Sequence, residues 1–285
     1  KGARVIHWTQ DIYPELPMRL DGMRWLSPLC RLRNREWRQS TACIAIGTDM
    51  RDFILRSGVS ARRVRVIPNW APQGLVPATP ELIRQRREAW GLNGKFVVAY
   101  SGNLGRAHEL EVIIALAAEL REAAGLIFLF IGEGAQLGRL RAMVEAQRLN
   151  NVRFLPPQSR DDLAVTLGAA DAHFVTLRPG CEALVFPSKF YGILAVGRPV
   201  FYIGPLQTEI ARWIREARLG AAFDREDTPA VAAEIKRWQL DPELVARMGR
   251  NAVNALPAQG GLASAATLWQ ELLAAPAEPT SIQAL

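Results

Sequence analysis

Short apolar runs alternate with amphipathic stretches from about residue 96 onward. Five runs are mostly apolar and predict buried strands, at 96–101, 126–131, 152–155, 172–177 and 199–203. Each precedes a stretch with helical periodicity, at 108–124, 135–149, 160–168, 188–196 and 207–217. This alternation is typical of a parallel sheet with helices on both faces. Residues 96–220 are therefore predicted to form a complete doubly wound α/β domain.

The same pattern is shorter before residue 70. Strands are predicted over 3–8, 41–47 and 64–67, with a basic helix over 18–40 and a second helix over 48–57. Three strands are too few to close a core, so residues 1–70 are predicted to be part of another α/β domain. Residues 71–95 form the predicted linker, with four prolines over 68–80 and a helix over 80–90. Further helices are predicted over 228–239, 241–255 and 262–274. The second predicted domain therefore covers 96–255, and a last helix with a tail covers 256–285.

Composition narrows the class of protein without naming a function. With 285 residues, 49% hydrophobic and 22% charged, the chain is expected to be globular, and neither disordered nor collagen-like. Its three cysteines, Cys30, Cys43 and Cys181, lack the spacing of a metal site, and such unpaired cysteines favour a reducing compartment. The chain begins within a predicted strand and without Met, so we expect it to be a fragment or a processed product.

Positive charge is concentrated in the first quarter of the chain. Residues 1–70 contain 13 basic and 6 acidic side chains, whereas residues 71–285 contain 22 of each. Within the predicted helix, four arginines share one face and three apolar residues share another: Arg24, Arg31, Arg35 and Arg38, and Trp25, Leu29 and Leu32. Such a helix can lie on an anionic membrane surface. It can equally pack on a core and leave its basic face in water.

Two segments after predicted strands could bind an anion. Gly102-Asn103-Leu104-Gly105-Arg106 lies between a strand and a helix, where glycines leave backbone N–H groups available to a phosphate, although a simple tight turn is the alternative. In Pro187-Ser188-Lys189, Ser188 is a good N-cap and Lys189 begins the helix. A cation there is unfavourable unless a dianion lies nearby. With Glu182 in the preceding loop, the pair fits a sugar and its phosphate, or else a surface ion pair.

Two further strand ends are less specific. The pair Gly132 and Gly134 either lies near a nucleotide or only permits close packing. Phe154 to Pro157 ends a strand in two prolines, and this rigid loop either holds a flat base or is a plain strand end.

Four segments occur in one order along the chain: Gly102-Asn103-Leu104-Gly105-Arg106, Gly132-Glu133-Gly134, Pro187-Ser188-Lys189-Phe190-Tyr191-Gly192 and Ala195-Val196-Gly197-Arg198-Pro199-Val200. Together with Asp11-Ile12-Tyr13-Pro14-Glu15 and Ile67-Pro68-Asn69-Trp70, they resemble the family 4 glycosyltransferases of the GT-B fold. The resemblance covers nearly the whole chain and is closest to the branch that builds colanic acid, O-antigen and capsule in bacteria.

The resemblance implies an α/β fold of two Rossmann-like domains with parallel sheets. The C-terminal domain would bind a nucleotide-diphosphate sugar, and the last helix would return to the N-terminal, acceptor-binding domain. Family members begin with further strands and helices, so the resemblance implies that the N-terminal domain is incomplete here. It also implies transfer with retention of configuration to a polyprenyl-linked or oligosaccharide acceptor, at the inner face of the cell membrane. Nucleic acid is not an expected partner.

Roles for single residues also come from the resemblance. Arg106 and Lys189 would stabilise the donor diphosphate, while Gly102, Asn103, Gly105, Gly132 and Ser188 would surround it. Glu182 would contact the donor sugar, Asp11 would lie on the acceptor side, and Phe154 and Pro156 would border the base. The chain departs from the family at the paired glutamates, because the second falls on Gly192 and strict spacing places the first on Leu184.

No Asp-x-Asp motif or metal-ligand cluster is present in the sequence, so a metal-independent hexosyltransferase without a cofactor is predicted. Two alternatives remain. One is an inactive nucleotide- or membrane-binding fragment. The other is a GT-B nucleotide-sugar epimerase, which would need catalytic carboxylates and histidines, and the chain has only His7, His108 and His173.

Overall fold

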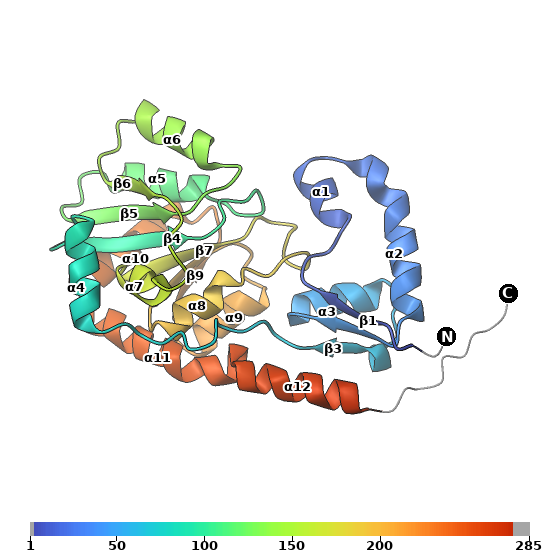
Figure 1. Ribbon diagram of the computed structural model, residues 1–285. Coiled ribbons are helices and arrows are strands. Elements are labelled where there is room, and N and C mark those ends of the chain that lie inside the picture. Colours follow the sequence, from blue (N-terminus) through green and yellow to red (C-terminus); the bar gives the residue numbers. More distant parts are fainter. Residues whose placement is uncertain (1–2, 276–285) are drawn as a thin grey trace. The chain divides into compact units, whose positions relative to one another are not determined.

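The computed structural model describes residues 3–275, which divide into two compact units (Figure 1). Unit 1 contains the described residues up to Asn69, Gly180–Phe186 and those from Gly260 on. Unit 2 contains Trp70–Pro179 and Pro187–Gln259. Of the tail predicted after residue 275, residues 276–285 lie outside the described residues.

Unit 2 is built on a six-stranded parallel sheet in the order β6-β5-β4-β7-β8-β9. Its strands are β4 (Phe96–Ser101), β5 (Leu126–Ile131), β6 (Val152–Leu155), β7 (Ala172–Thr176), β8 (Val200–Ile203) and β9 (Gly220–Phe223). The first five confirm the predicted strands. β9 was not predicted, because its sequence Gly-Ala-Ala-Phe lacks the branched and aromatic residues that mark a strand. Gly220 is required at its start, since a Cβ there would fall on the carbonyl oxygen of Val200.

Helices cover both faces of this sheet (Figure 1). They are α4 (Pro80–Ala89), α5 (Glu111–Glu119), α6 (Leu137–Ala146), α7 (Leu163–Gly168), α8 (Lys189–Ala195), α9 (Glu209–Glu216), α10 (Thr228–Leu240) and α11 (Pro242–Gly260). On one face the core includes Phe128, Phe174, Phe201 and Trp238, and the last two rings stack with centroids 3.8 Å apart. A second cluster around Leu129 buries the other face. Burial on both faces explains why most strand positions are apolar and do not alternate with polar ones.

Unit 1 contains a three-stranded parallel sheet, β1 (Ile6–Thr9), β2 (Ala42–Ala45) and β3 (Val64–Val66), in that order. With it lie α1 (Glu15–Leu20), α2 (Ser27–Gln39), α3 (Thr48–Arg56), α12 (Leu262–Ala274) and two short 3-10 helices, η1 (Arg24–Leu26) and η2 (Ala61–Arg63). In α12, Trp269 packs edge-on against Trp8 of β1, and the Arg4 guanidinium donates to the carbonyl oxygens of Leu272 and Leu273 at 2.7 and 2.8 Å.

The single helix predicted over 18–40 is wrong. The chain forms α1, a break, η1 and then α2. Gly22 adopts φ +68° within the break, in the left-handed region where a helix ends. Pro28 then occupies the first turn of α2, where its missing N–H costs nothing. The basic segment is therefore a short helix that follows a turn.

Within residues 3–275, no helix combines the length and apolar composition needed to cross a membrane.

Candidate functional site

The carboxyl ends of β4 and β7 form the strongest candidate site in unit 2. These strands are neighbours, and the chain leaves them in opposite directions, because β5 and β6 lie beyond β4 while β8 and β9 lie beyond β7. Open α/β sheets bind ligands at such a switch point, in the crevice at the strands' carboxyl ends.

Lys189, the first residue of α8, brings a buried cation to this place. Its Nζ lies 3.4 Å from the centroid of the Tyr100 ring, and a Cβ added at Gly102 would lie 3.7 Å from it. The residue as a whole is partly exposed, but Nζ is shielded from water and has no hydrogen-bond acceptor among the described residues. Burial holds the pKa of Lys189 well below its ordinary value. A buried ammonium group without an acceptor is costly, and an incoming anion would remove that cost.

Other polar atoms at these strand ends are also buried and without hydrogen-bond partners among the described residues. They are Oγ of Ser101, the last residue of β4, and Oγ1 of Thr176, the last residue of β7. Neither was predicted, although both are hydroxyl residues that end strands beside the switch point. Unsatisfied buried hydroxyls are uncommon in folded proteins and are often completed by a ligand or water.

His108 contributes to the electrostatics of the site through its position beside Tyr100 and Lys189. Its Nδ1 lies 2.7 Å from the carbonyl oxygen of Thr176, and its ring meets Tyr100 edge-on at 5.8 Å. Burial and the positive charge of Lys189 lower the pKa of His108 to about 3, so the imidazole is neutral at pH 7. His173 is fully buried and lies 2.9 Å from the Leu167 carbonyl oxygen through Nε2. The full burial of His173 keeps its ring away from any substrate, whereas His108 is half-buried.

The glycine loops after β4 and β5 pack against each other. A Cβ on Gly132 would fall on the carbonyl oxygen of Gly102, and the Gly102 N–H donates to Ile131 at 2.8 Å. The Leu104 N–H is taken by the Glu133 carbonyl oxygen, also at 2.8 Å. Close packing therefore accounts for Gly132, and two of the N–H groups expected to face a phosphate are already bonded.

Several residues of the β4–α5 loop lie at the surface of unit 2. Gly102, Asn103 and Arg106 are exposed and Gly105 is half-buried. Among the described residues, the N–H groups of Asn103 and Gly105 have no acceptor. The loop thus presents two backbone donors on the segment that passes Lys189, and Arg106 belongs to the same loop.

Three other predicted donor residues lie at neighbouring strand or helix ends. Phe154 of β6 stacks on Phe130 with centroids 5.1 Å apart, so one face of its ring is used by the core. Pro156 follows β6 and is exposed, but its carbonyl oxygen accepts a hydrogen bond from Gln158 at 2.8 Å. Ser188 occupies the N-cap position of α8 without a side-chain capping bond, so the capping that the sequence suggested is wrong.

The other two predicted catalytic residues, Asp11 and Glu182, belong to unit 1. Asp11 follows β1, and although much of the residue is exposed, desolvation of its carboxyl group raises its pKa. The Glu182 carboxylate accepts the Gly180 N–H at 2.9 Å, a bond within its own loop. The same loop accepts the Ile12 N–H through the Leu184 carbonyl oxygen at 2.8 Å, which joins it to the motif that contains Asp11.

An ion pair fixes this motif from α2 and was not predicted. The Arg33 guanidinium binds both carboxylate oxygens of Glu15 and donates to the Tyr13 carbonyl oxygen at 2.7 Å. It also lies 4.2 Å from the centroid of Trp37. Burial alone would raise the pKa of Glu15, but the bonds and charge of Arg33 lower it. Not every arginine of the basic segment therefore faces solvent.

Over residues 3–275, no group of three or more His, Cys, Asp or Glu side chains is arranged to hold a metal ion.

The sequence of this chain is similar to those of known glycosyltransferases. The family model described as "Glycosyl transferases group 1" matches residues 83–255, which is more than half of the chain. The chain belongs to this glycosyltransferase family. Its sequence is 30% identical to "Putative colanic acid biosynthesis glycosyl transferase WcaI" of Escherichia coli over 203 residues, 70% of this chain and 49% of that protein. It is 26% identical to "Probable glycosyltransferase WbjE" of Pseudomonas aeruginosa over 243 residues, 82% of this chain and 59% of that protein.

Solved structures show the fold of this family member. The Anabaena protein Alr3699/HepE, in complex with UDP and glucose, matches with a TM-score of 0.80 at 17% identity, over 96% of this chain and 72% of that one. WaaG, a glycosyltransferase involved in lipopolysaccharide biosynthesis, matches with a TM-score of 0.77 at 15% identity, over 95% and 75%. These matches confirm the predicted GT-B fold. The chain spans between about half and three fifths of the length of the two relatives named above.

Proposed function

We propose that this chain carries the donor site of a retaining glycosyltransferase that uses a nucleotide-diphosphate sugar. The observation that carries the proposal is Nζ of Lys189 at the switch point between β4 and β7, which is buried and has no acceptor among residues 3–275. A diphosphate would supply the missing partner, and the leaving nucleotide gains negative charge in the transition state. A cation held in a low-dielectric site stabilises that charge more than it would in water. Arg106 would be the second cation.

The family and its relatives support this class of substrate. The HepE structures contain UDP or UDP-glucose, and WcaI is named for colanic acid biosynthesis. For this chain we propose a nucleotide sugar as the donor. We propose as the acceptor a lipid-linked glycan of a bacterial surface polysaccharide. Because Lys189 and Arg106 would stabilise the negative charge of the leaving nucleotide, the proposed reaction uses neither metal ion nor cofactor. EDTA should leave its rate unchanged.

Retention would follow from a front-face displacement, in which a donor phosphate oxygen helps to deprotonate the acceptor. No protein nucleophile is then required. The anomeric configuration of the first product formed, read by proton NMR in D₂O, tests this step. An inverted anomer would contradict retention without affecting the donor site.

Binding of a panel of nucleoside diphosphates and their sugars, measured by calorimetry, tests the donor site. One nucleoside diphosphate is expected to bind, and the corresponding nucleotide sugar is expected to be slowly hydrolysed or to transfer its sugar. Lack of binding to every member of the panel would refute the proposal. Binding without any turnover would instead favour the nucleotide-binding fragment.

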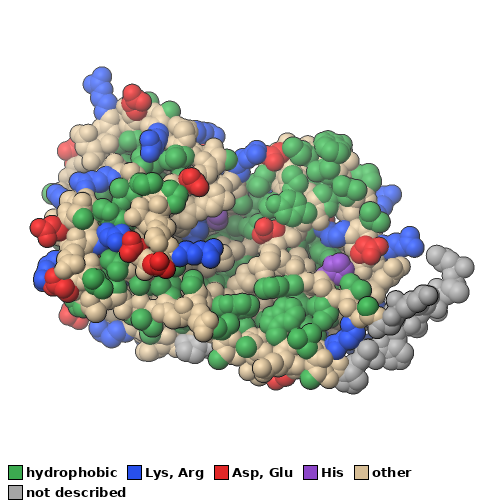
Figure 2. Space-filling model, viewed as in Figure 1, with side chains coloured by type: hydrophobic (Ala, Val, Ile, Leu, Met, Phe, Trp, Pro, Cys, Tyr) green, Lys and Arg blue, Asp and Glu red, His purple; other side chains and the backbone are tan. Residues whose placement is uncertain are grey.

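We further propose that α2 and the turn before it attach the protein to an anionic membrane at its inner face. Trp25, Leu29 and Leu32 are 75%, 49% and 57% exposed, so this apolar row does not pack on the core of unit 1. Figure 2 shows hydrophobic side chains gathered over α1 and the start of α2. Arg31 and Arg35 are exposed on α2 and form no bond or ion pair with the described residues. An apolar row beside arginines is complementary to anionic lipid.

Vesicle sedimentation tests the attachment. Each arginine near the surface contributes about 1 kcal/mol at low salt. The double variant Arg31→Gln/Arg35→Gln should therefore bind vesicles with 30% phosphatidylglycerol about 30-fold more weakly. Trp25→Ser should weaken binding to a similar degree. Leu82→Ser, a matched loss of a 46% exposed leucine on α4, should not. Equal binding of all variants would exclude this surface.

A further inference from the structure

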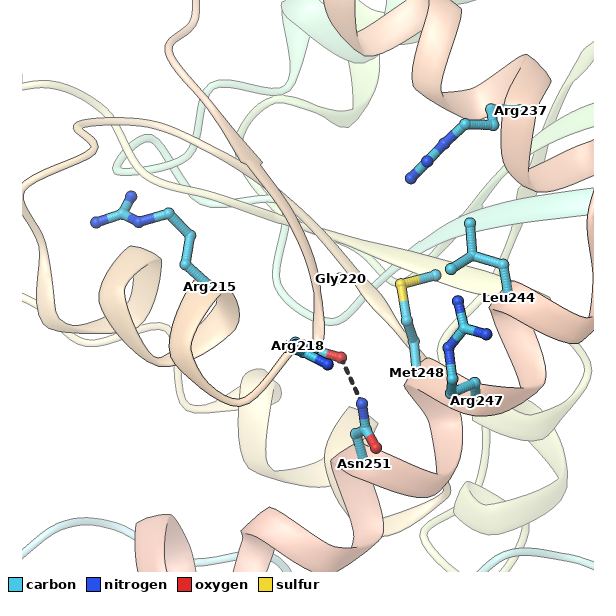
Figure 3. A pocket seen from close by; sticks show the side chains of 8 residues that line it. All are labelled: Arg215, Arg218, Gly220, Arg237, Leu244, Arg247, Met248 and Asn251. Carbon is cyan, nitrogen blue, oxygen red and sulfur yellow. Dashed lines mark hydrogen bonds between the residues drawn. The ribbon is translucent and has the colours of Figure 1, made fainter.

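A cavity of about 540 Å³ lies on unit 2 where the end of α9, α10 and α11 meet. Four arginines line it: Arg215 and Arg218 from the end of α9 and the turn into β9, Arg237 from α10 and Arg247 from α11 (Figure 3). Met248 forms part of its apolar wall, and Asn251 fixes the turn by donating to the Arg218 carbonyl oxygen at 3.1 Å. The volume is within the range of small-molecule sites.

This cavity is separate from the proposed donor site. Gly220, which also lines it, is the first residue of β9 and pairs with Val200, the first residue of β8. The cavity is therefore at the amino ends of the strands. Lys189 lies at the carboxyl ends of the same parallel sheet, so one ligand cannot occupy both places.

The charges that line the cavity are largely uncompensated. None of its lining residues is acidic. Arg237 is paired with Glu234 at 2.5 Å, and Arg215 donates to the Leu206 carbonyl oxygen at 3.1 Å. The guanidinium groups of Arg218 and Arg247 have no partner among residues 3–275. All four arginines are exposed, so water screens their mutual repulsion, and an anion bound among them would gain charge-assisted contacts.

The chemistry of the lining identifies the anion. Guanidinium forks bind phosphate oxygens in pairs, and several forks around one cavity suit a ligand with more than one charge. We propose that this cavity is a second anion site that binds a phosphate-bearing ligand, either a free di- or polyphosphate or the phosphate of a lipid headgroup. It would be occupied independently of the nucleotide sugar.

The backbone at Arg218 offers a variant that removes charge without straining the fold. Arg218 adopts φ +52° after α9, with its N–H on the Arg215 carbonyl oxygen and the next N–H on Ile214. Glycine is favoured in this conformation. Arg148 has the same φ after α6, with the same pair of bonds to Glu145 and Val144, but does not line the cavity. Arg148→Gly is therefore a matched control for Arg218→Gly.

Two double variants test the site: Arg218→Gly/Arg247→Gln in the cavity, and Arg148→Gly/Arg250→Gln as the control. Arg250 is exposed on α11 outside the cavity. Binding of inorganic pyrophosphate is measured by calorimetry, and binding of vesicles with 30% phosphatidylglycerol in phosphatidylcholine by sedimentation. The cavity variant should lose at least tenfold in affinity for one probe, and the control should stay within twofold.

Loss of pyrophosphate binding alone would identify a soluble phosphate ligand, whereas loss of vesicle binding alone would identify a lipid headgroup. The vesicle comparison is unaffected by α2, which is intact in both variants. Thermal unfolding should show both variants folded, because each glycine relieves a left-handed residue. If the two double variants bind both probes alike, the proposed site is wrong.

Discussion

Replacing Lys189 with methionine is expected to stabilise the ligand-free protein and to weaken its binding of a nucleoside diphosphate. Methionine has a similar length and fills the same space without a charge. In the free protein, Nζ is buried without an acceptor in the part of the chain that the structure describes, and the ring of Tyr100 at 3.4 Å partly compensates its charge. Removing an unsatisfied buried polar group typically recovers about 1–3 kcal/mol, and the lost cation–π contact offsets up to about 2 kcal/mol of this.

The expected net gain is about 1 kcal/mol in the free energy of unfolding, or roughly 2–4 °C in Tm. The gain should depend on pH with a definite sign. Burial lowers the pKa of Lys189 in the folded state, so between that value and the ordinary pKa of lysine the unfolded chain binds an extra proton. The parent protein therefore loses stability as the pH falls through this window, and the methionine variant does not. The difference should be largest at low pH and vanish near pH 10.5.

The same substitution should raise the Kd of the nucleotide about 10- to 100-fold, because it removes a charge-assisted bond of about 1.5–3 kcal/mol. Denaturant unfolding at several pH values and calorimetry give both quantities. Lys236→Met, which removes an exposed lysine from α10, is the control and should change neither. A Lys189→Met protein that is less stable and binds nucleotide normally would refute the reasoning.

Three further measurements probe the same structure. Nucleotide binding should take up protons, because an anion beside Lys189 raises its lowered pKa; calorimetry in buffers of different ionisation enthalpy reads this uptake, and release of protons would contradict it. Gly132→Ala should lower the free energy of unfolding by about 3 kcal/mol or more, because its φ is +140° and a Cβ would meet the carbonyl oxygen of Gly102. The control Gly138→Ala, in open space on α6, should raise the free energy of unfolding by up to about 1 kcal/mol. Equal unfolding midpoints for the two variants would show that the glycine loops after β4 and β5 are not in contact. Glu15→Gln should lower the stability of the folded protein above about pH 5 and have little effect at lower pH. The reason is that the ion pair with Arg33, which lowers the pKa of Glu15, stabilises the fold only while the carboxylate is ionised. An effect on thermal unfolding that does not depend on pH would argue against the ion pair.

The first five strands of unit 2 were predictable because burial on both faces favours apolar residues at most positions. β9 was missed because Gly220, Ala221 and Ala222 form a strand only where β8 provides an edge. The basic segment was misjudged for a local reason, since one left-handed residue, Gly22, divides a stretch whose periodicity otherwise continues.

The candidate site was predictable only in part. Lys189 stood out because a cation at a helix start after a strand is unfavourable. Its burial under Tyr100 was not predictable, because which strands become neighbours is not readable from chain order. Two other contacts were not predictable for the same reason. The Gly102 N–H donates to the Ile131 carbonyl oxygen of β5, and Arg33 binds Glu15.

The most direct test of the central claim pairs one substitution with one change of ligand. Binding of the preferred nucleoside diphosphate and of its nucleoside is measured for the parent and for Lys189→Met. If Lys189 binds the diphosphate at the β4–β7 switch point, the parent should favour the diphosphate strongly, and the variant should lose about 10- to 100-fold of that preference while binding the nucleoside unchanged. An equal preference in both proteins would contradict the account.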